Sequence, residues 1–116
     1  MFQLGTGRRF AEITDGLSNT LMVGEKHVPL NKLGVGWWDN SFYNGEYPSS
    51  HARGAGPQYP LASSLNSTEM VFGSYHTAVC QFGFCDGSVR GIAFDIDLTT
   101  LGNLACRNDG QVIPDY

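Results

Sequence analysis

The chain has 116 residues, a length that suits one domain with its own hydrophobic core but not two domains. Hydrophobic residues make up 41% of it, which is enough apolar surface to offset the entropy of ordering and excludes a disordered chain. Seven basic and eleven acidic residues give a net charge of −4 without long charged runs, and this excludes the basic stripe typical of nucleic-acid-binding proteins. No stretch approaches the roughly 20 apolar residues that a membrane-spanning helix needs. We therefore treat residues 1–116 as one globular domain.

The first predicted elements lie between residues 10 and 28. Thr14 or Asp15 is suited to cap a single helical turn, because short polar side chains accept the N–H groups at the start of a helix. A strand is predicted to follow, from Thr20 to about Lys26.

Residues 29–67 are predicted to be a long ordered loop or insertion, because they hold four of the five prolines and many glycines. One short strand is expected around Val35 to Trp38. Aromatic rings stack on sugars or on partner side chains, so this loop is a candidate ligand or interface surface. Alternatively, the rings form a small core that pins the loop to the sheet, and one of the two adjacent tryptophans is expected to be buried. The aromatic residues are Trp37, Trp38, Phe42, Tyr43, Tyr47 and Tyr59.

The strongest local pattern is a hairpin. Val79 to Cys85 is apolar, Val89 to Ile96 alternates with period two, and a further strand is expected from Glu69 to Phe72. Asp86-Gly87 lies between the two main runs and predicts a two-residue type I′ turn, in which both central residues have positive φ. These strands predict an antiparallel β-meander.

A short helix closes the predicted fold, near residues 98–106. Asp97 or Thr99 is suited to cap it, Gly110 lies where the chain turns after it, and its apolar face contains Leu98, Leu101 and Leu104. The predicted fold class is therefore α+β, with a mainly antiparallel β-meander, a short C-terminal helix and a long aromatic loop rich in Gly and Pro.

Three blocks of the sequence resemble one bacterial family. His76, nine further residues and Asp86-Gly87 are similar to the His-x9-Asp-Gly motif of the prepilin-type processing-associated proteins. Residues 10–29, FAEITDGLSNTLMVGEKHVP, resemble that family's Ile-x-Asp-Gly-x-Ser-Asn-Thr block and the Gly-Glu after it. The tail LGNLACRNDGQVIPDY resembles its closing Leu-x-x-Leu-x-x-Arg-x-x-Gly segment. The motif positions to which we assign a structural role are His76, Asp86, Gly87, Asp15, Gly16, Asn19 and Glu25.

The resemblance implies a non-catalytic structural or assembly module. Members of that family usually begin with a prepilin leader and a long apolar helix, so this chain corresponds to the globular head of a pilin-like or pseudopilin-like protein. The resemblance implies a place in the bacterial cell envelope, on the periplasmic face or outside, and a link to type II secretion. Protein partners or self-assembly are expected, and the membrane is reached only through a segment absent from this chain. The alternative is an extracellular module that binds a glycan or peptide through the aromatic loop.

Catalytic and metal sites have weaker support. His76 with Asp86, and Ser74 or Ser88 as nucleophile, suggest acid–base chemistry, but no third orienting group is evident and ten residues of a hairpin separate the pair. We expect no enzymatic activity and no cofactor. Carboxylates are oxygen ligands that calcium accepts, although Asp97 is equally explained as a helix cap, and no intrinsic metal is expected. The weak calcium candidates are Asp95, Asp97 and Asp109.

The three cysteines cannot all pair. Cys80 and Cys85 lie five residues apart in one predicted strand, too far apart for a disulfide. Any bridge therefore joins Cys106 to one of them, with Cys85 beside the turn the better candidate. The alternative is three free thiols that act as small apolar residues.

Overall fold

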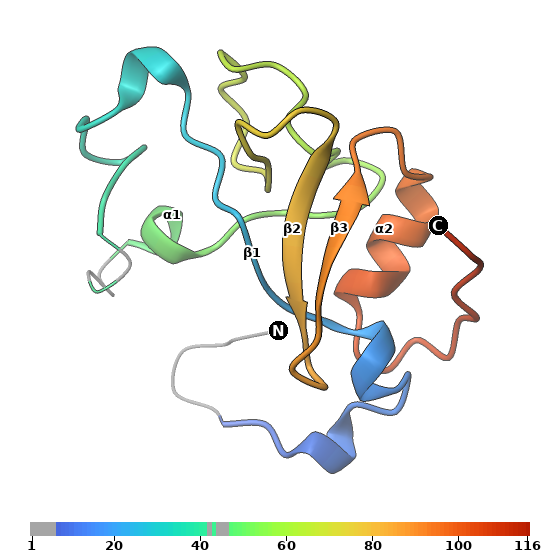
Figure 1. Ribbon diagram of the computed structural model, residues 1–116. Helices are drawn as coiled ribbons and strands as arrows, with labels where there is room; N and C mark the ends of the chain where they lie inside the picture. Colours follow the sequence, from blue (N-terminus) through green and yellow to red (C-terminus); the bar gives the residue numbers. More distant parts are fainter. Residues whose placement is uncertain (1–6, 42, 44–46) are drawn as a thin grey trace.

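The computed structural model describes residues 7–41, 43 and 47–116, and a three-stranded antiparallel sheet forms its centre (Figure 1). The strand order is β1-β2-β3, so the sheet follows the order of the chain. The strands are β1 (Leu21–Gly24), β2 (Val79–Phe84) and β3 (Val89–Ala93). The helical elements are η1 (Phe10–Glu12), η2 (Leu17–Asn19), η3 (Leu30–Lys32), α1 (Pro48–His51) and α2 (Leu98–Ala105). The predicted α+β class is confirmed, and no helix of the described residues has the length and apolar character needed to cross a membrane.

The hydrophobic core lies between one face of the sheet and α2. Alternate residues of β2 point into it, as the period-two pattern predicts, and α2 adds residues three apart on one face. Asp97 caps α2, because its Oδ1 accepts the backbone N–H of Thr100 at 2.8 Å and the Thr100 hydroxyl at 3.0 Å. The capping role expected of Asp97 is confirmed, and Thr99 lies inside the helix. The buried core residues are Leu21, Leu61, Cys80, Phe82, Phe84, Ile92, Leu101 and Leu104.

The hairpin between β2 and β3 is present, but its turn differs from the prediction. The N–H of Phe84 donates to the carbonyl of Ser88 at 2.9 Å, and the N–H of Gly87 donates to the carbonyl of Phe84 at 3.0 Å. The loop therefore has three residues, Cys85 to Gly87. Gly87 has φ +85, whereas Asp86 does not have a positive φ. A three-residue loop that ends in a left-handed glycine replaces the predicted type I′ turn.

Two predictions for the chain between β1 and β2 are also wrong. The segment Val35 to Trp38 forms turns, because the N–H groups of Trp38 and Asp39 both donate to the carbonyl of Val35, at 3.2 and 2.9 Å. Trp37 has φ +79, a backbone conformation that no strand accommodates. The strand predicted from Glu69 to Phe72 is reduced to isolated bridges, of which Phe72 with Lys26 extends the sheet beyond β1.

The segment before β1 also differs in detail. Thr14 and Asp15 do not cap a helical turn, because η2 begins after Gly16, which has φ +97. The strand predicted from Thr20 to Lys26 is confirmed in a shorter form as β1, and its register on β2 shifts between Leu21 and Val23.

Candidate functional site

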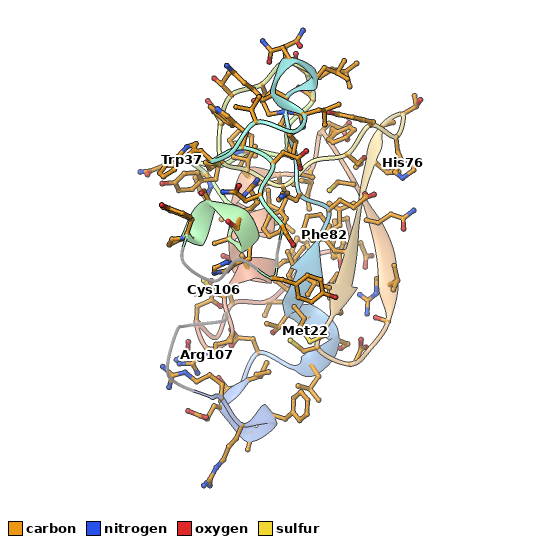
Figure 2. All side chains as sticks on the ribbon, turned by 90° about the vertical axis from the view of Figure 1, so that its left-hand side faces the viewer. Met22, Trp37, His76, Phe82, Cys106 and Arg107 are labelled. Carbon is orange, nitrogen blue, oxygen red and sulfur yellow. The ribbon has the colours of Figure 1, made fainter. Side chains whose placement is uncertain are left out.

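Asp15 joins the chain before β1 to the chain after α2. Its Oδ2 accepts the N–H of Asp109 at 2.8 Å, and its Oδ1 accepts the N–H of Gly110 at 2.9 Å. The backbone N–H of Asp15 donates to the carbonyl of Arg107 at 3.3 Å, and the Arg107 guanidinium donates to the carbonyl of Glu12 at 2.8 Å. Arg107 and Gly110 belong to the closing block of the sequence. The first and last blocks therefore form one structural joint, near Cys106 and Arg107 in Figure 2.

Gly16 and Asn19 shape the turn that presents Asp15. The positive φ of Gly16 starts η2, and the Asn19 side-chain amide donates to the carbonyl of Asp15 at 3.4 Å. The Thr20 hydroxyl donates to the carbonyl of Gly16 at 3.0 Å. These bonds give Gly16 and Asn19 a role in the backbone geometry of this turn.

Asp86 fixes the hairpin turn. Its Oδ1 accepts the N–H of Ser88 at 2.8 Å, and its Oδ2 lies 3.7 Å from a guanidinium nitrogen of Arg90. The Ser88 side chain and backbone together hold the pKa of Asp86 below its usual range. The backbone N–H of Asp86 also donates to the carbonyl of Leu17 at 3.1 Å, which attaches the turn to η2.

His76 is paired with Glu25. Their Nε2 and Oε1 atoms lie 3.3 Å apart, and the Oε2 of Glu25 accepts the backbone N–H of Gln81 at 2.6 Å. His76 precedes β2 and Asp86 follows it, so six residues of strand, about 20 Å, separate the two. The Ser74 hydroxyl donates to the carbonyl of Val79 at 2.6 Å. His76 and Asp86 therefore do not form an acid–base pair, and the Ser74 hydroxyl is engaged by backbone.

A shallow pocket of about 330 Å³ adjoins the His76–Glu25 pair. Lys26 and Tyr75 also line it, and the Tyr75 hydroxyl donates to the carbonyl of Val28. Glu25 was a motif residue in the sequence, but its partner was missed. Only the register of β1 on β2 brings His76 to it.

The calcium candidates do not form a site. Asp97 accepts two hydrogen bonds from Thr100, and the first of them, from the backbone, is the main reason why the pKa of Asp97 lies below its usual range. The Oδ1 of Asp109 accepts the N–H of Gln111 at 2.9 Å. Within the described residues no three His, Cys, Asp or Glu side chains gather into a metal-binding group, and Asp95 is not joined to the other two.

None of the three cysteines forms a disulfide, so the candidate bridge between Cys85 and Cys106 is absent. Cys80 and Cys85 are buried, and Cys106 is exposed. Burial, helped by the charge of Glu25, raises the pKa of the Cys80 thiol to about 12. Burial also raises the pKa of Cys85 and Cys106, so the thiols are protonated at neutral pH.

The aromatic residues of the segment 29–67, which also contains η3 and α1, are mostly exposed. Trp37 is 56% exposed and Tyr43 is 85% exposed, and Tyr47 and Tyr59 are also at the surface. Trp38 is half-buried, so the expected burial of one tryptophan is met only in part. Phe42 lies outside the described residues. Trp37 projects on the side of the molecule away from His76 (Figure 2).

The outer face of the sheet, opposite the core, is uncharged. Cross-strand pairing places Val23 beside Gly83, Gly83 beside Val89, and Val79 beside Ala93. Val23 is 53% exposed and Val89 is 68% exposed. We call this surface the outer sheet face, and its members are Val23, Val79, Gln81, Gly83, Val89, Gly91 and Ala93.

A larger cleft, of about 880 Å³, is lined by residues of both β1 and α1. All four residues of β1 line it, together with Lys26, Ser50 and Arg53. We call it the β1 cleft. No sequence pattern reveals the β1 cleft, because it depends on a one-turn helix packed near a strand edge, which leaves no period in the sequence.

A family model described as "Protein of unknown function (DUF1559)" matches residues 1–99. The chain belongs to this family. The matched part of the DUF1559 domain contains the whole sheet and the residues Asp15, Glu25, His76 and Asp86. The match ends within α2, before Arg107 and Gly110. Searches of curated proteins and of solved structures gave no match.

Proposed function

We propose that this DUF1559 domain is a non-catalytic building block of a pilin-like or pseudopilin-like assembly in the bacterial cell envelope. The observation that carries the proposal is the outer sheet face, which exposes valine, alanine and glycine, has Gln81 as its one polar member and contains no charged residue. Contiguous exposed apolar surface marks interaction sites in soluble domains.

The outer sheet face suits a second copy of this chain. Each chain carries a net charge of −4, so copies repel one another wherever acidic side chains meet. On the outer sheet face no like charges meet. Gly83 and Gly91, which have no Cβ, and the small side chain of Ala93 allow close approach. Burying this apolar area between two copies would stabilise their association by about 25 cal/mol per Å².

The motif residues support a structural role. The carboxylates of Asp15, Glu25 and Asp86 each accept at least one backbone N–H group. Such bonds fix the geometry of the chain and leave these groups poorly placed for transfer of a proton to a substrate. The resemblance to the prepilin-type His-x9-Asp-Gly proteins agrees with this role and supports a periplasmic or extracellular location.

The test is a charge placed on the outer sheet face. Val23→Lys and Val89→Lys should abolish the cross-linked oligomers of the native protein in its cell of origin, with the melting midpoint unchanged. Val112→Lys is the matched control, because Val112 is 88% exposed and lies in the C-terminal segment. Oligomers that persist in both face variants, or a native protein that is always a lone monomer, would refute the proposal.

A second candidate function is extracellular binding of a glycan or peptide through the aromatic loop. It is favoured by Trp37, whose indole is more than half exposed. Saturable glycan binding lost in Trp37→Ala, and retained in a variant of the half-buried Trp38, would favour this function over assembly.

A further inference from the structure

The β1 cleft has an unusual charge distribution, centred on Arg53. The guanidinium donates to the carbonyls of Ser49 and Ala52, both at 2.7 Å, and to that of His27 at 3.4 Å. Its Nε is buried and has no acceptor. Among the described residues no carboxylate pairs with it. A half-buried cation without a counter-ion is costly, so the cleft favours an anion.

Lys26 adds a second positive charge to the same cleft. Its Nζ donates to the carbonyl of Asn40 at 2.9 Å and lies 3.9 Å from Oδ1 of Asp39. The other oxygen of Asp39 accepts the N–H of Gly34 at 2.8 Å. Burial and the charge of Arg53 both lower the pKa of Lys26. Two cations and one carboxylate leave a charge of plus one in this cleft, on a chain whose net charge is −4.

Ser50 provides an unused polar group at the same place. The residue is fully buried, it lines the cleft, and its hydroxyl has no hydrogen-bond partner. Buried hydroxyl groups are nearly always hydrogen-bonded, so an unpaired one in a cleft wall indicates a missing partner.

The edge of β1 is open along the cleft. β1 pairs with β2 on one side only, and the bridge between Lys26 and Phe72 begins beyond the end of the strand. In the part of the chain that the structure describes, nothing pairs with the outer edge of Leu21–Gly24. Four strand residues span about 13 Å, enough to pair with a short extended segment. Peptides commonly bind in this way, as an added strand at a sheet edge.

We propose that the β1 cleft binds an extended peptide segment that pairs with the open edge of β1 and places a carboxylate against Lys26 and Arg53. The apolar side chains of the segment contact Leu21, Ala55 and Phe72, which line the cleft. The proposal does not rest on the assembly role, because it uses the edge of the sheet, Lys26 and Arg53. Val23 belongs to both the β1 cleft and the outer sheet face, whereas Val89 lies outside the cleft lining, so Val89→Lys is the variant that separates the two roles.

The probe is the peptide acetyl-Asp-Val-Thr-Val-Asp-amide, which carries a carboxylate at each end and so fits either strand direction. We expect saturable binding by calorimetry, with shifted amide resonances for Leu21–Gly24. The matched acetyl-Asn-Val-Thr-Val-Asn-amide should bind at least about tenfold more weakly, because a hydrogen bond to a charged group contributes more than a neutral one. The Asp peptide with alternate amides N-methylated should not bind, because it cannot pair as a strand.

Variants locate the carboxylate. Arg53→Gln and Lys26→Gln should each lower the affinity for the Asp peptide at least about tenfold. Lys32→Gln is the control, because it removes a positive charge outside the cleft lining, and it should leave the affinity unchanged. The melting midpoint of each variant is measured alongside, and the Asn peptide tests the anion on the unaltered protein. Equal affinity for the Asp and Asn peptides, binding of the N-methylated peptide, unshifted β1 amides, or the absence of saturable binding would each overturn the proposal.

Discussion

Asp15, Asp86 and Asp97 have the same task at three places in the chain. Each carboxylate accepts backbone N–H groups, at a chain crossing, a hairpin turn and a helix start respectively. Hydrogen bonds to an ionised acceptor are roughly twice as strong as neutral ones. From the sequence, Asp86 was also considered for acid–base chemistry and Asp97 for calcium binding, whereas Asp15 was given a structural role. An isolated aspartate in a sequence does not reveal which of these roles it has.

Asp15→Ala should detach the segment after α2. The N–H groups of Asp109 and Gly110 lose their acceptor, and unfolding free energy should fall by about 2 kcal/mol. Denaturant titration measures the loss, and faster amide exchange at Asp109 and Gly110 locates it. Asp115→Ala is the control, since it removes an exposed carboxylate near the chain end. Unchanged exchange at these two amides would show that the joint does not depend on Asp15.

Gly87→Val should destabilise the hairpin by about 1–2 kcal/mol, because a β-branched residue is strained at φ +85. No atom lies within 4 Å of an added Cβ, so the cost comes from the backbone alone. Gly87→Asn should cost less, since asparagine tolerates this conformation. Equal melting midpoints for the native protein, Gly87→Val and Gly87→Asn would contradict this account.

At the scale of elements, the cap of α2 makes the stability of the protein fall at acid pH, because the capping group is the carboxylate of Asp97. The N–H of Thr100 holds the pKa of Asp97 below its usual range. A carboxyl whose pKa is lower when folded contributes stability above its unfolded pKa, about 3.9, and this contribution is lost as pH falls through the folded value.

Asp97→Asn should therefore flatten the fall in melting midpoint between about pH 5 and pH 2, because asparagine still caps the helix but does not titrate in this range. Some slope should remain, since the pKa of Asp86 is lowered in the same direction. Melting curves of the two proteins across this range are the measurement. Identical slopes would mean that the cap does not titrate as described.

Sequence predicted the elements that local patterns specify. The hairpin and α2 follow from period-two and helical spacing with a turn or cap at the boundary. The strand predicted at Val35 to Trp38 was wrong, because the positive φ of Trp37 belongs to a tight turn that no hydrophobic pattern reveals. α1 was missed, since it is one turn long, although Pro48 at its first position is a typical start signal.

The candidate sites were less predictable than the elements. Asp15 and Asp109 are 94 residues apart, and Glu25 and Gln81 are 56 apart. Periodicity in a sequence shows only which nearby residues share a face. The sequence therefore singled out Asp15 and Glu25 but not the distant residues to which they are hydrogen-bonded. The β1 cleft depends on the same kind of distant packing.

For the molecule as a whole, thiol reactivity should report unfolding. Only Cys106 is exposed, and the pKa of Cys80 is raised to about 12. A maleimide at neutral pH should modify one thiol slowly in the native protein and all three in denaturant. Cys106→Ser should remove the native reaction. Rapid modification of a second native thiol would show that the core opens locally.

The two ladders of the sheet close loops of very different length. Only residues 85–88 lie between β2 and β3, whereas residues 25–78 separate β1 from β2. Closing a short loop costs little chain entropy, so we expect the hairpin to form early in folding and β1 to dock late. Substitutions in β1 should then change mainly the unfolding rate, and those in the hairpin mainly the folding rate. Until β1 docks, β2 has an unpaired edge, and this edge is where we expect a slowly folding chain to aggregate.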